Sequence, residues 1–223
     1  MYGKVPPPGD PIPINVEPFV VNDAMPEEVE IRGVVKGMRN GRAGGASGIR
    51  AENMKEWLRD AVLEETKEAE GIAGFKGKGD RWRMFTKLMQ TIWEKGVIPQ
   101  QMRWMTVVLI PKGGGDFRGI GLLEPFWKAI EILIDRRLQV VEFHDCLHGF
   151  IGGRGTGTAT IEAKLAQQLA HLEQEPLFET FIDLKKAYDA MDRERCMEIL
   201  IGYEVGPNML RLIKHFWDTA LLV

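Results

Sequence analysis

Cysteine is scarce in this sequence, and long apolar runs are absent. Cys146 and Cys196 are the only two cysteines, and a pair so far apart fits neither a disulfide framework nor a cysteine-based zinc site. No stretch approaches the roughly 18 apolar residues that a membrane span needs. The first residues carry Pro6, Pro7 and Pro8 instead of the basic and apolar run of a secretory signal. We therefore expect an intracellular protein in a reducing compartment, without a membrane partner.

Net charge is also low, because 29 Lys and Arg residues are balanced by 32 Asp and Glu residues to give −3. Such a balance argues against nucleic-acid binding by net charge alone. The local distribution is different. No acid lies between Glu30 and Glu52, whereas the stretch from Glu52 to Glu70 is strongly acidic. The near-neutral total therefore hides a basic stretch, whose cations are Arg32, Lys36, Arg39, Arg42 and Arg50.

The remaining composition is that of a globular protein with a sizeable core, since 44 % of the 223 residues are hydrophobic and 27 % are charged. Short β-branched runs predict strands over 105–110, ended by Pro111, and over 177–184. Apolar residues spaced three and four apart predict several amphipathic helices. These helices are expected over 29–38, 51–70, 82–93, 125–141, 159–171, 192–201 and 207–221. The expected fold class is α+β.

An acid interrupts the second predicted strand, where Asp183 stands between Ile182 and Leu184. A charge in an apolar strand is costly unless a cation, a metal ion or hydrogen-bond donors compensate it. The alternative is an acid at a strand end that caps the following helix. Residues 181–192 read Phe-Ile-Asp-Leu-Lys-Lys-Ala-Tyr-Asp-Ala-Met-Asp.

This string resembles the first catalytic motif in the palm of reverse transcriptases of non-LTR retroelements and group II introns, Phe-x-Asp-x-x-x-Ala-Phe/Tyr-Asp. The resemblance implies that Asp183 is a catalytic residue that binds the divalent metal ions, Mg²⁺ or Mn²⁺. It implies that Tyr188 lies beneath the sugar of the incoming nucleotide and excludes a 2′-hydroxyl. The implied activity is RNA-directed DNA polymerisation by two-metal phosphoryl transfer, with an RNA template, a DNA primer and dNTP as partners. Asp192, in contrast, is expected to cap the helix that begins at Arg193.

Segments upstream resemble the fingers of the same family, in the same order. Residues 107–112 and 117–123 resemble its Pro-Lys and Arg-Pro-Ile elements, which implies that Lys112 and Arg118 reach the triphosphate from either side of a glycine-rich turn. Gly119 stands where the family usually has Pro, a departure that we expect to loosen this turn. Residues 44–49 resemble the motif at which basic and glycine residues meet the template backbone, which implies a template contact for Arg42.

Residues 148–158 resemble a further family segment, Gln-x-Gly-Phe-x-x-Gly-x-Gly/Ser-Thr, in which glycines let backbone amides approach the template. The resemblance implies that Gly153, Arg154 and Gly155 bind the template. One alternative is the phosphate loop of a nucleoside triphosphatase, although no Gly-Lys-Ser/Thr follows these glycines. Another alternative is a metal site, since ligand chemistry gathers in His144, Asp145, Cys146 and His148.

The resemblance divides the chain into a Pro-rich extended arm (1–26), a mostly helical fingers region (27–175) and the first part of the palm of a right-hand polymerase (176–223). The family's Tyr/Phe-x-Asp-Asp hairpin and thumb are not found in the sequence. We therefore expect that this chain alone does not polymerise and that it self-associates through exposed palm surface. The alternative function is that of a non-catalytic nucleic-acid-binding or interaction module derived from a retroelement.

Overall fold

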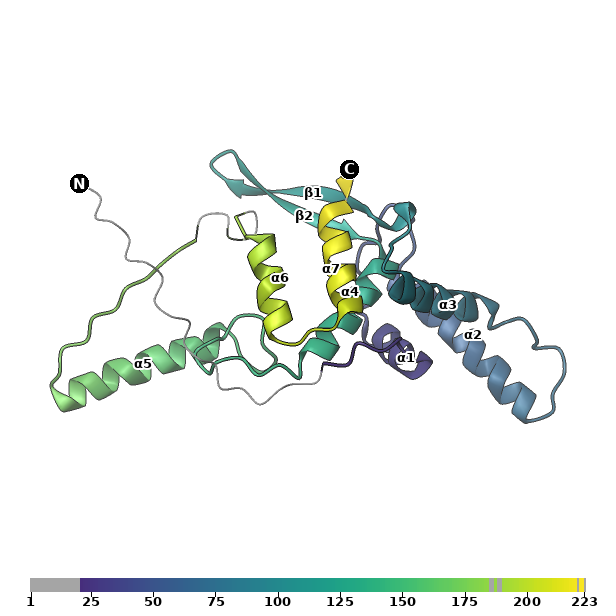
Figure 1. Ribbon diagram of the computed structural model, residues 1–223, viewed down its shortest axis with the longest axis horizontal. Coiled ribbons are helices and arrows are strands. Elements are labelled where there is room, and N and C mark those ends of the chain that lie inside the picture. The colour runs from purple at the N-terminus through teal and green to yellow at the C-terminus, as the bar shows by residue number, and fades with distance from the viewer. Residues whose placement is uncertain (1–20, 185–186, 188–189, 220, 223) are drawn as a thin grey trace. The chain divides into compact units, whose positions relative to one another are not determined.

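The computed structural model of the protein describes residues 21–184, 187, 190–219, 221 and 222. In these residues the chain is a mixture of helices and strands (Figure 1), which confirms the α+β class at this coarse level. The elements are α1 (Glu28–Gly37), α2 (Ala51–Ala69), α3 (Asp80–Lys95), the 3-10 helix η1 (Gln100–Met102), β1 (Trp104–Gly113), β2 (Asp116–Leu123), α4 (Pro125–Leu138), α5 (Thr156–Glu173), α6 (Arg193–Gly202), α7 (Pro207–Thr219) and β3 (Leu221–Leu222).

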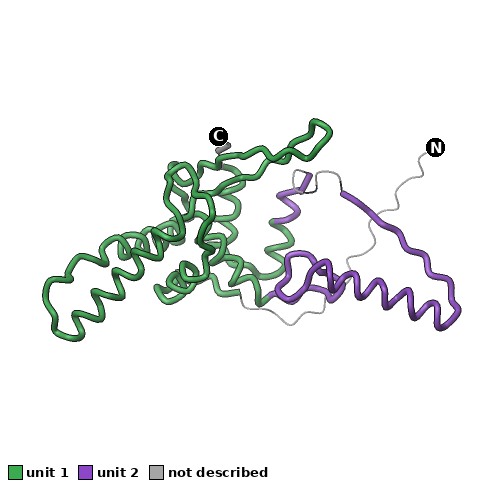
Figure 2. The backbone as a smooth tube through the Cα atoms, turned by 180° about the vertical axis from the view of Figure 1, so that it is seen from behind, with its two compact units in different colours: residues 1–140, 197–223 green, residues 141–196 purple. Residues whose placement is uncertain are grey.

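Two compact units make up the chain (Figure 2). Unit 1 comprises residues 1–140 and 197–223, and unit 2 comprises residues 141–196. The boundaries between these units lie after residues 140 and 196, whereas the family resemblance places its boundaries after residues 26 and 175. Most of the Pro-rich arm, residues 1–20, lies outside the described residues. No helix of the described residues has the length and apolar character needed to cross a membrane.

The core of unit 1 lies among α1, α2, α3, α4 and α7, each of which buries apolar side chains. Helices with an apolar stripe are stabilised mainly by burying it against one another, because a short isolated helix is marginal in water. Aromatic rings connect the elements: the ring centroids of Phe85 and Phe126 are 5.5 Å apart, and Trp127 stacks on Phe216 at 4.5 Å. The most deeply buried large side chains include Ile31, Trp82, Met89, Trp93, Ile130, Leu133, Met209 and Leu212.

A buried arginine near the end of α4 connects this core to the start of the described chain. Arg137 is only 6 % exposed. Its guanidinium donates two hydrogen bonds to the Glu30 carboxylate, at 2.7 and 3.1 Å, and two more to the carbonyl oxygens of Asn22 and Ala24. The same group lies 4.7 Å from the ring centroid of Trp93. A buried charge is tolerated only with such partners.

Asp23 attaches the same N-terminal segment to a second helix. Its carboxylate accepts hydrogen bonds from the backbone N–H groups of Asn208 and Met209, both at 2.9 Å, in the first turn of α7. Those N–H groups have no partner within the helix, and an acid at a helix N-terminus also meets the positive end of its dipole. The Asp23 carbonyl oxygen accepts from Trp93 Nε1 at 3.2 Å. Residues 21–26 are therefore part of the folded unit.

The link between α2 and α3 is organised by a buried acid, Glu64, which is 2 % exposed. Its carboxylate accepts hydrogen bonds from the backbone N–H groups of Gly77 and Gly79, at 2.8 and 2.5 Å, and from Arg83 at 3.1 Å. These donors hold the pKa of Glu64 below its ordinary value of 4.5. The glycine-rich link at residues 71–79 is thus closed onto α2 by one side chain.

The prediction of a strand over 177–184 is wrong, because residues 175–184 form neither helix nor strand. A strand requires a neighbouring backbone to pair with, and the neighbour here is a helix: Gln167 of α5 donates to the Glu179 carboxylate at 2.9 and 3.0 Å. Asp183 is exposed rather than held in an apolar strand.

The prediction that Pro111 ends the first strand is also wrong. β1 continues to Gly113, and the register with β2 shifts between Pro111 and Gly113. Proline, which lacks an N–H, is tolerated in a strand near such an irregularity.

All seven predicted helices are present, with ends that differ by a few residues. The Asp192 cap is confirmed, since its carboxylate accepts from the backbone N–H of Arg195 at 3.0 Å.

Replacing Arg137 with alanine is expected to lower the free energy of unfolding by about 3 kcal/mol, because the Glu30 carboxylate and two carbonyl oxygens lose a buried donor. Urea denaturation followed by tryptophan fluorescence measures the change. The control is Arg81→Ala, an exposed arginine of α3, which should change stability by less than about 0.5 kcal/mol. Equal losses in the two variants would contradict the assignment.

Replacing Glu64 with glutamine is expected to destabilise the protein at neutral pH and to matter less in acid. Because the pKa of Glu64 is depressed in the folded state by the Gly79 and Gly77 amides, its contribution is complete above the unfolded-state pKa. The contribution is lost as the pH falls through the folded-state value. The difference between the urea midpoints of the two proteins should therefore begin to shrink near pH 4.5 and vanish only at a pH below the depressed folded-state pKa. A difference that stays constant would rule out this role.

Candidate functional site

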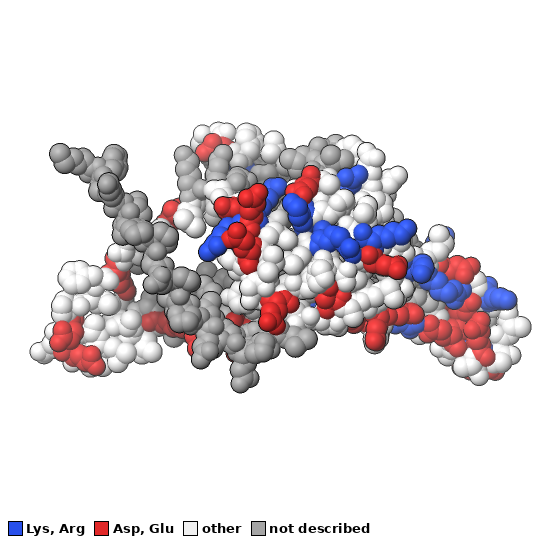
Figure 3. All heavy atoms as spheres, in the orientation of Figure 1, with Lys and Arg blue, Asp and Glu red and all other residues white. Residues whose placement is uncertain are grey.

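A basic hollow of about 590 Å³ lies in unit 1, where the end of α1, the loop at residues 38–50, the end of β2 and α4 meet. Four cations and no carboxylates line it. Lys128 is paired with Glu131 at 2.9 Å. The other three, Arg39, Arg42 and Arg50, are exposed and form no ion pair with any described residue. On the face drawn in Figure 3, Lys and Arg side chains gather in a band.

The loop at residues 38–50, which lines this hollow, is held by a buried acid at the residue before α4. Glu124, 1 % exposed, accepts hydrogen bonds from the backbone N–H of Ser47 at 2.8 Å and from its hydroxyl at 2.5 Å. A Cβ on Gly45 would lie 2.6 Å from the Glu124 carboxylate, and one on Gly44 would lie 2.3 Å from the Ile49 carbonyl oxygen. Close packing therefore requires glycine at positions 44 and 45, whereas Gly48 has open space around it and a φ of +72°.

The β1–β2 hairpin places Lys112 and Arg118 at its turn end. The two strands are antiparallel, and Arg118 stands opposite Ile110. Lys112 lies at the register shift between Pro111 and Gly113 and has no partner in the register, and both cations are exposed. Arg118 comes three residues before Gly121, which lines the basic hollow; that is about 10 Å along an extended strand. The two cations and the hollow thus belong to one continuous part of unit 1.

Gly119 does not loosen the turn, because it lies within β2, opposite Leu109. A Cβ at this position would lie 3.2 Å from Val107 Cγ1, a tight contact on the side of the hairpin that Val107 and Leu109 share. The expectation of a looser turn is therefore wrong. The turn is instead formed by Gly113, Gly114 and Gly115, which all have positive φ.

Unit 2 contains Asp183, which lies in the extended segment after α5 and is exposed. Tyr188 lies outside the described residues. Nowhere in the described part of the chain do three His, Cys, Asp or Glu side chains lie close enough to hold a metal ion. Asp183, a hard oxygen ligand, thus belongs to no group of three such side chains among the described residues.

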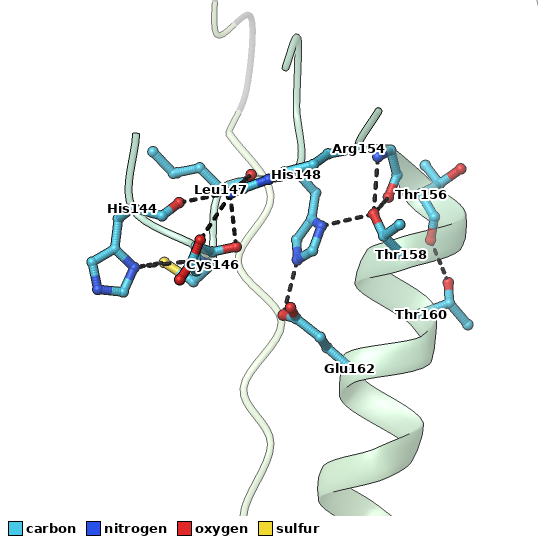
Figure 4. A network of polar contacts seen from close by, with 11 residues as sticks. His144, Cys146, Leu147, His148, Arg154, Thr156, Thr158, Thr160 and Glu162 are labelled. Atoms are coloured by element: carbon cyan, nitrogen blue, oxygen red, sulfur yellow. Dashed lines mark hydrogen bonds and ion pairs between the residues drawn. The ribbon is translucent and has the colours of Figure 1, made fainter. Parts of the chain in front are cut away.

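Arg154 has several partners within its own loop (Figure 4). Its guanidinium donates to the carbonyl oxygens of His144, Asp145 and Leu147, at 3.0 to 3.1 Å, and to the Asp145 carboxylate at 2.9 Å. The side chain therefore closes the turn at residues 144–147. These bonds use Nη1 and Nη2, so a template contact by Arg154 would use Nε or the remaining Nη2 proton, or would replace some of these bonds. The neighbouring Gly153 has a φ of +77°, which favours glycine.

His148 fastens the same loop to α5. Its Nδ1 lies 2.8 Å from the Thr158 hydroxyl, and its Nε2 lies 2.9 Å from the Glu162 carboxylate (Figure 4). The Gly155 N–H donates to the Thr158 hydroxyl at 3.0 Å, so this donor of the helix N-terminus already has a partner. His144, in contrast, contacts Cys146 at 3.0 Å. Of the four residues of the alternative metal site, His144 and Cys146 therefore contact each other, whereas Asp145 pairs with Arg154 and His148 bonds to α5.

Sequence reasoning singled out Arg42 in the basic hollow but not Glu124, Lys128 or the roles of Arg39 and Arg50. Arg39 and Arg50 were recognised only as members of the basic stretch. The one local signal for Glu124 is an acid between apolar Leu123 and the proline that opens α4. Comparison with models of known protein families finds no match to this chain, and comparison with curated proteins finds none either.

Replacing Glu124 with alanine is expected to release the loop at residues 44–49, because the Ser47 amide and hydroxyl lose a charged acceptor. Hydrogen exchange of the Ser47 and Gly48 amides should become roughly tenfold faster or more, as expected for loss of a hydrogen bond to a charged group. Exchange measured by mass spectrometry on the peptide that contains these residues tests it. The control is Glu56→Ala, an exposed acid of α2; equal exchange in the two variants would exclude the assignment.

Proposed function

We propose that the chain is the fingers region and the first part of the palm of an RNA-directed DNA polymerase of the non-LTR retroelement and group II intron type. The observation that carries the proposal is the combination, within unit 1, of a hollow lined by unpaired arginines with a hairpin that holds Lys112 and Arg118 at its turn. These are the positions at which the family resemblance expects template and triphosphate contacts.

The basic hollow suits a nucleic-acid backbone. Arg39, Arg42 and Arg50 offer guanidinium groups in a lining that contains no carboxylate, and such groups bind phosphate through two parallel hydrogen bonds. Because the loop at residues 44–49 is fixed by Glu124, little ordering is needed when a strand binds. Contacts of this kind position a strand without reading its sequence, as a polymerase template site requires.

Nucleotide binding and catalysis are assigned through the same resemblance. Lys112 and Arg118 bind the triphosphate of dNTP, and Tyr188 excludes a 2′-hydroxyl. Asp183 supplies one oxygen ligand for Mg²⁺ or Mn²⁺, the ions that neutralise charge in phosphoryl transfer. The described residues by themselves do not fit a two-metal centre, so no catalytic step through the metal ions follows from them.

A second candidate is a non-catalytic module that binds nucleic acid. It is favoured by the location of the basic hollow, all of whose lining residues belong to unit 1, whereas Asp183 belongs to unit 2. Binding to the phosphate backbone of a nucleic acid needs cations and a fixed protein surface but no carboxylate.

Replacing Arg42 and Arg50 together with alanine is expected to weaken binding to an RNA template annealed to a DNA primer by roughly tenfold or more. The slope of log Kd against log salt should fall by about two, since two phosphate contacts are lost. Fluorescence anisotropy over a series of KCl concentrations measures both. The control is Arg81→Ala with Lys87→Ala, two exposed cations of α3.

The same assay separates the two candidates when dNTP and Mg²⁺ are added. Under the polymerase proposal, dNTP complementary to the template tightens the complex, and Lys112→Ala with Arg118→Ala abolishes the tightening. Binding without any dNTP effect would support the second candidate instead. Failure of the wild type to bind the primer-template at all would overturn both.

A further inference from the structure

A second hollow in unit 1, of about 770 Å³, follows one face of α2 and shares no lining residue with the basic hollow. Residues 52, 55, 59, 62 and 66 line it, and their spacing of three and four defines a single helix face. From residue 52 to residue 66 this face runs over about 21 Å, or four turns. Lys36 and Asn40 come from the end of α1 and the residues after it. We call this hollow the α2 groove.

The floor of the α2 groove is apolar and aliphatic. Leu58 is buried, whereas Val62 and Leu63 remain 40 % and 38 % exposed on the surface of the helix. Apolar surface of this kind gains free energy when another apolar surface covers it. It does not suit nucleic acid, because bases stack on flat rings and the phosphate backbone has no apolar group to offer.

Cations border this floor. Lys55 and Lys67 already have partners: Lys55 donates to the Met38 carbonyl oxygen at 2.6 Å, and Lys67 is paired with Glu70 at 2.7 Å. Lys36 and Arg59 are exposed and form no ion pair with any described residue. The one acid of the lining, Glu52, accepts from the Gly41 backbone N–H. The groove therefore offers two unpaired positive charges beside an apolar strip.

We propose that the α2 groove binds an acidic, amphipathic helix of a partner protein. Its length matches about four helical turns, its floor suits apolar anchors spaced three and four apart, and Lys36 and Arg59 suit flanking carboxylates. This arrangement is the helix-in-groove mode of recognition, with charge complementarity adding specificity and faster association. The inference does not depend on the polymerase proposal, because none of its residues lies in the basic hollow.

The test uses a fluorescent peptide of about 14 residues, with leucines at positions i, i+3, i+4 and i+7 and glutamates on both flanks. A peptide of the same composition in scrambled order is the control. Fluorescence anisotropy should give specific binding to the full chain. Replacing Lys36 and Arg59 together with glutamate should weaken it at least tenfold, whereas Arg81→Glu with Lys87→Glu, on α3, should not. Arg42→Ala with Arg50→Ala should also leave it unchanged.

Exchanging the charges of the peptide and the protein distinguishes a loss of specific contacts from misfolding of the variant. A version of the peptide with lysines in place of its glutamates should bind the Lys36→Glu, Arg59→Glu protein better than the wild type. Equal affinity for the scrambled peptide, or unchanged binding by the double variant, would overturn the proposal. So would competition by a single-stranded RNA that depends on Lys36 and Arg59. Concentration-dependent dimerisation that the double variant abolishes would instead assign the groove to a second copy of the chain and overturn the proposal as well.

Discussion

The fold of unit 1 depends on how the Arg137 charge is satisfied inside the protein. A guanidinium that is removed from water must recover its hydrogen bonds from fixed acceptors, and four of its bonds go to Glu30 and to two carbonyl oxygens near the start of the described chain. Because α1, α3, α4 and the segment before α1 all contribute to this environment, none can shift alone without leaving a charge or a carbonyl unpaired. Directional bonds therefore fix the arrangement that apolar packing only favours.

Glu124 performs the corresponding task for the candidate site. The acid is buried at the point where β2 passes into α4, and it controls a loop that lies far earlier in the sequence. The hydrogen bonds fix the loop, the glycines permit its close approach, and the arginines on either side are left facing solvent. A fixed loop flanked by exposed cations suits the phosphate backbone of a nucleic acid, because phosphate contacts position a strand without reading its sequence.

Amphipathic spacing located the helices because the signal is contained in each segment itself. The prediction of a strand at residues 177–184 failed for the opposite reason. β-branched and aromatic residues favour an extended chain, but a strand also needs a partner strand whose position no local pattern reveals. The candidate site likewise contains features with a local sequence signal and features without one. Lys112 and Arg118 flank a turn that three adjacent glycines predict, whereas Glu124 meets Ser47 across 77 residues of sequence. The partners of Arg154 could not be predicted from the sequence because three of its four acceptors are backbone carbonyls, which every sequence contains.

The contact between Asp23 and the start of α7 has a kinetic consequence. It joins residues that lie 185 and 186 positions apart in the sequence. Closing a loop of that length costs about 5 kcal/mol of chain entropy before any hydrogen bond is gained. Contacts so distant in sequence form slowly and usually late. During synthesis, Asp23 would leave the ribosome long before Asn208 and Met209 are made. The helices between them can therefore pack first, and Asp23 joins α7 only after Asn208 and Met209 have been made.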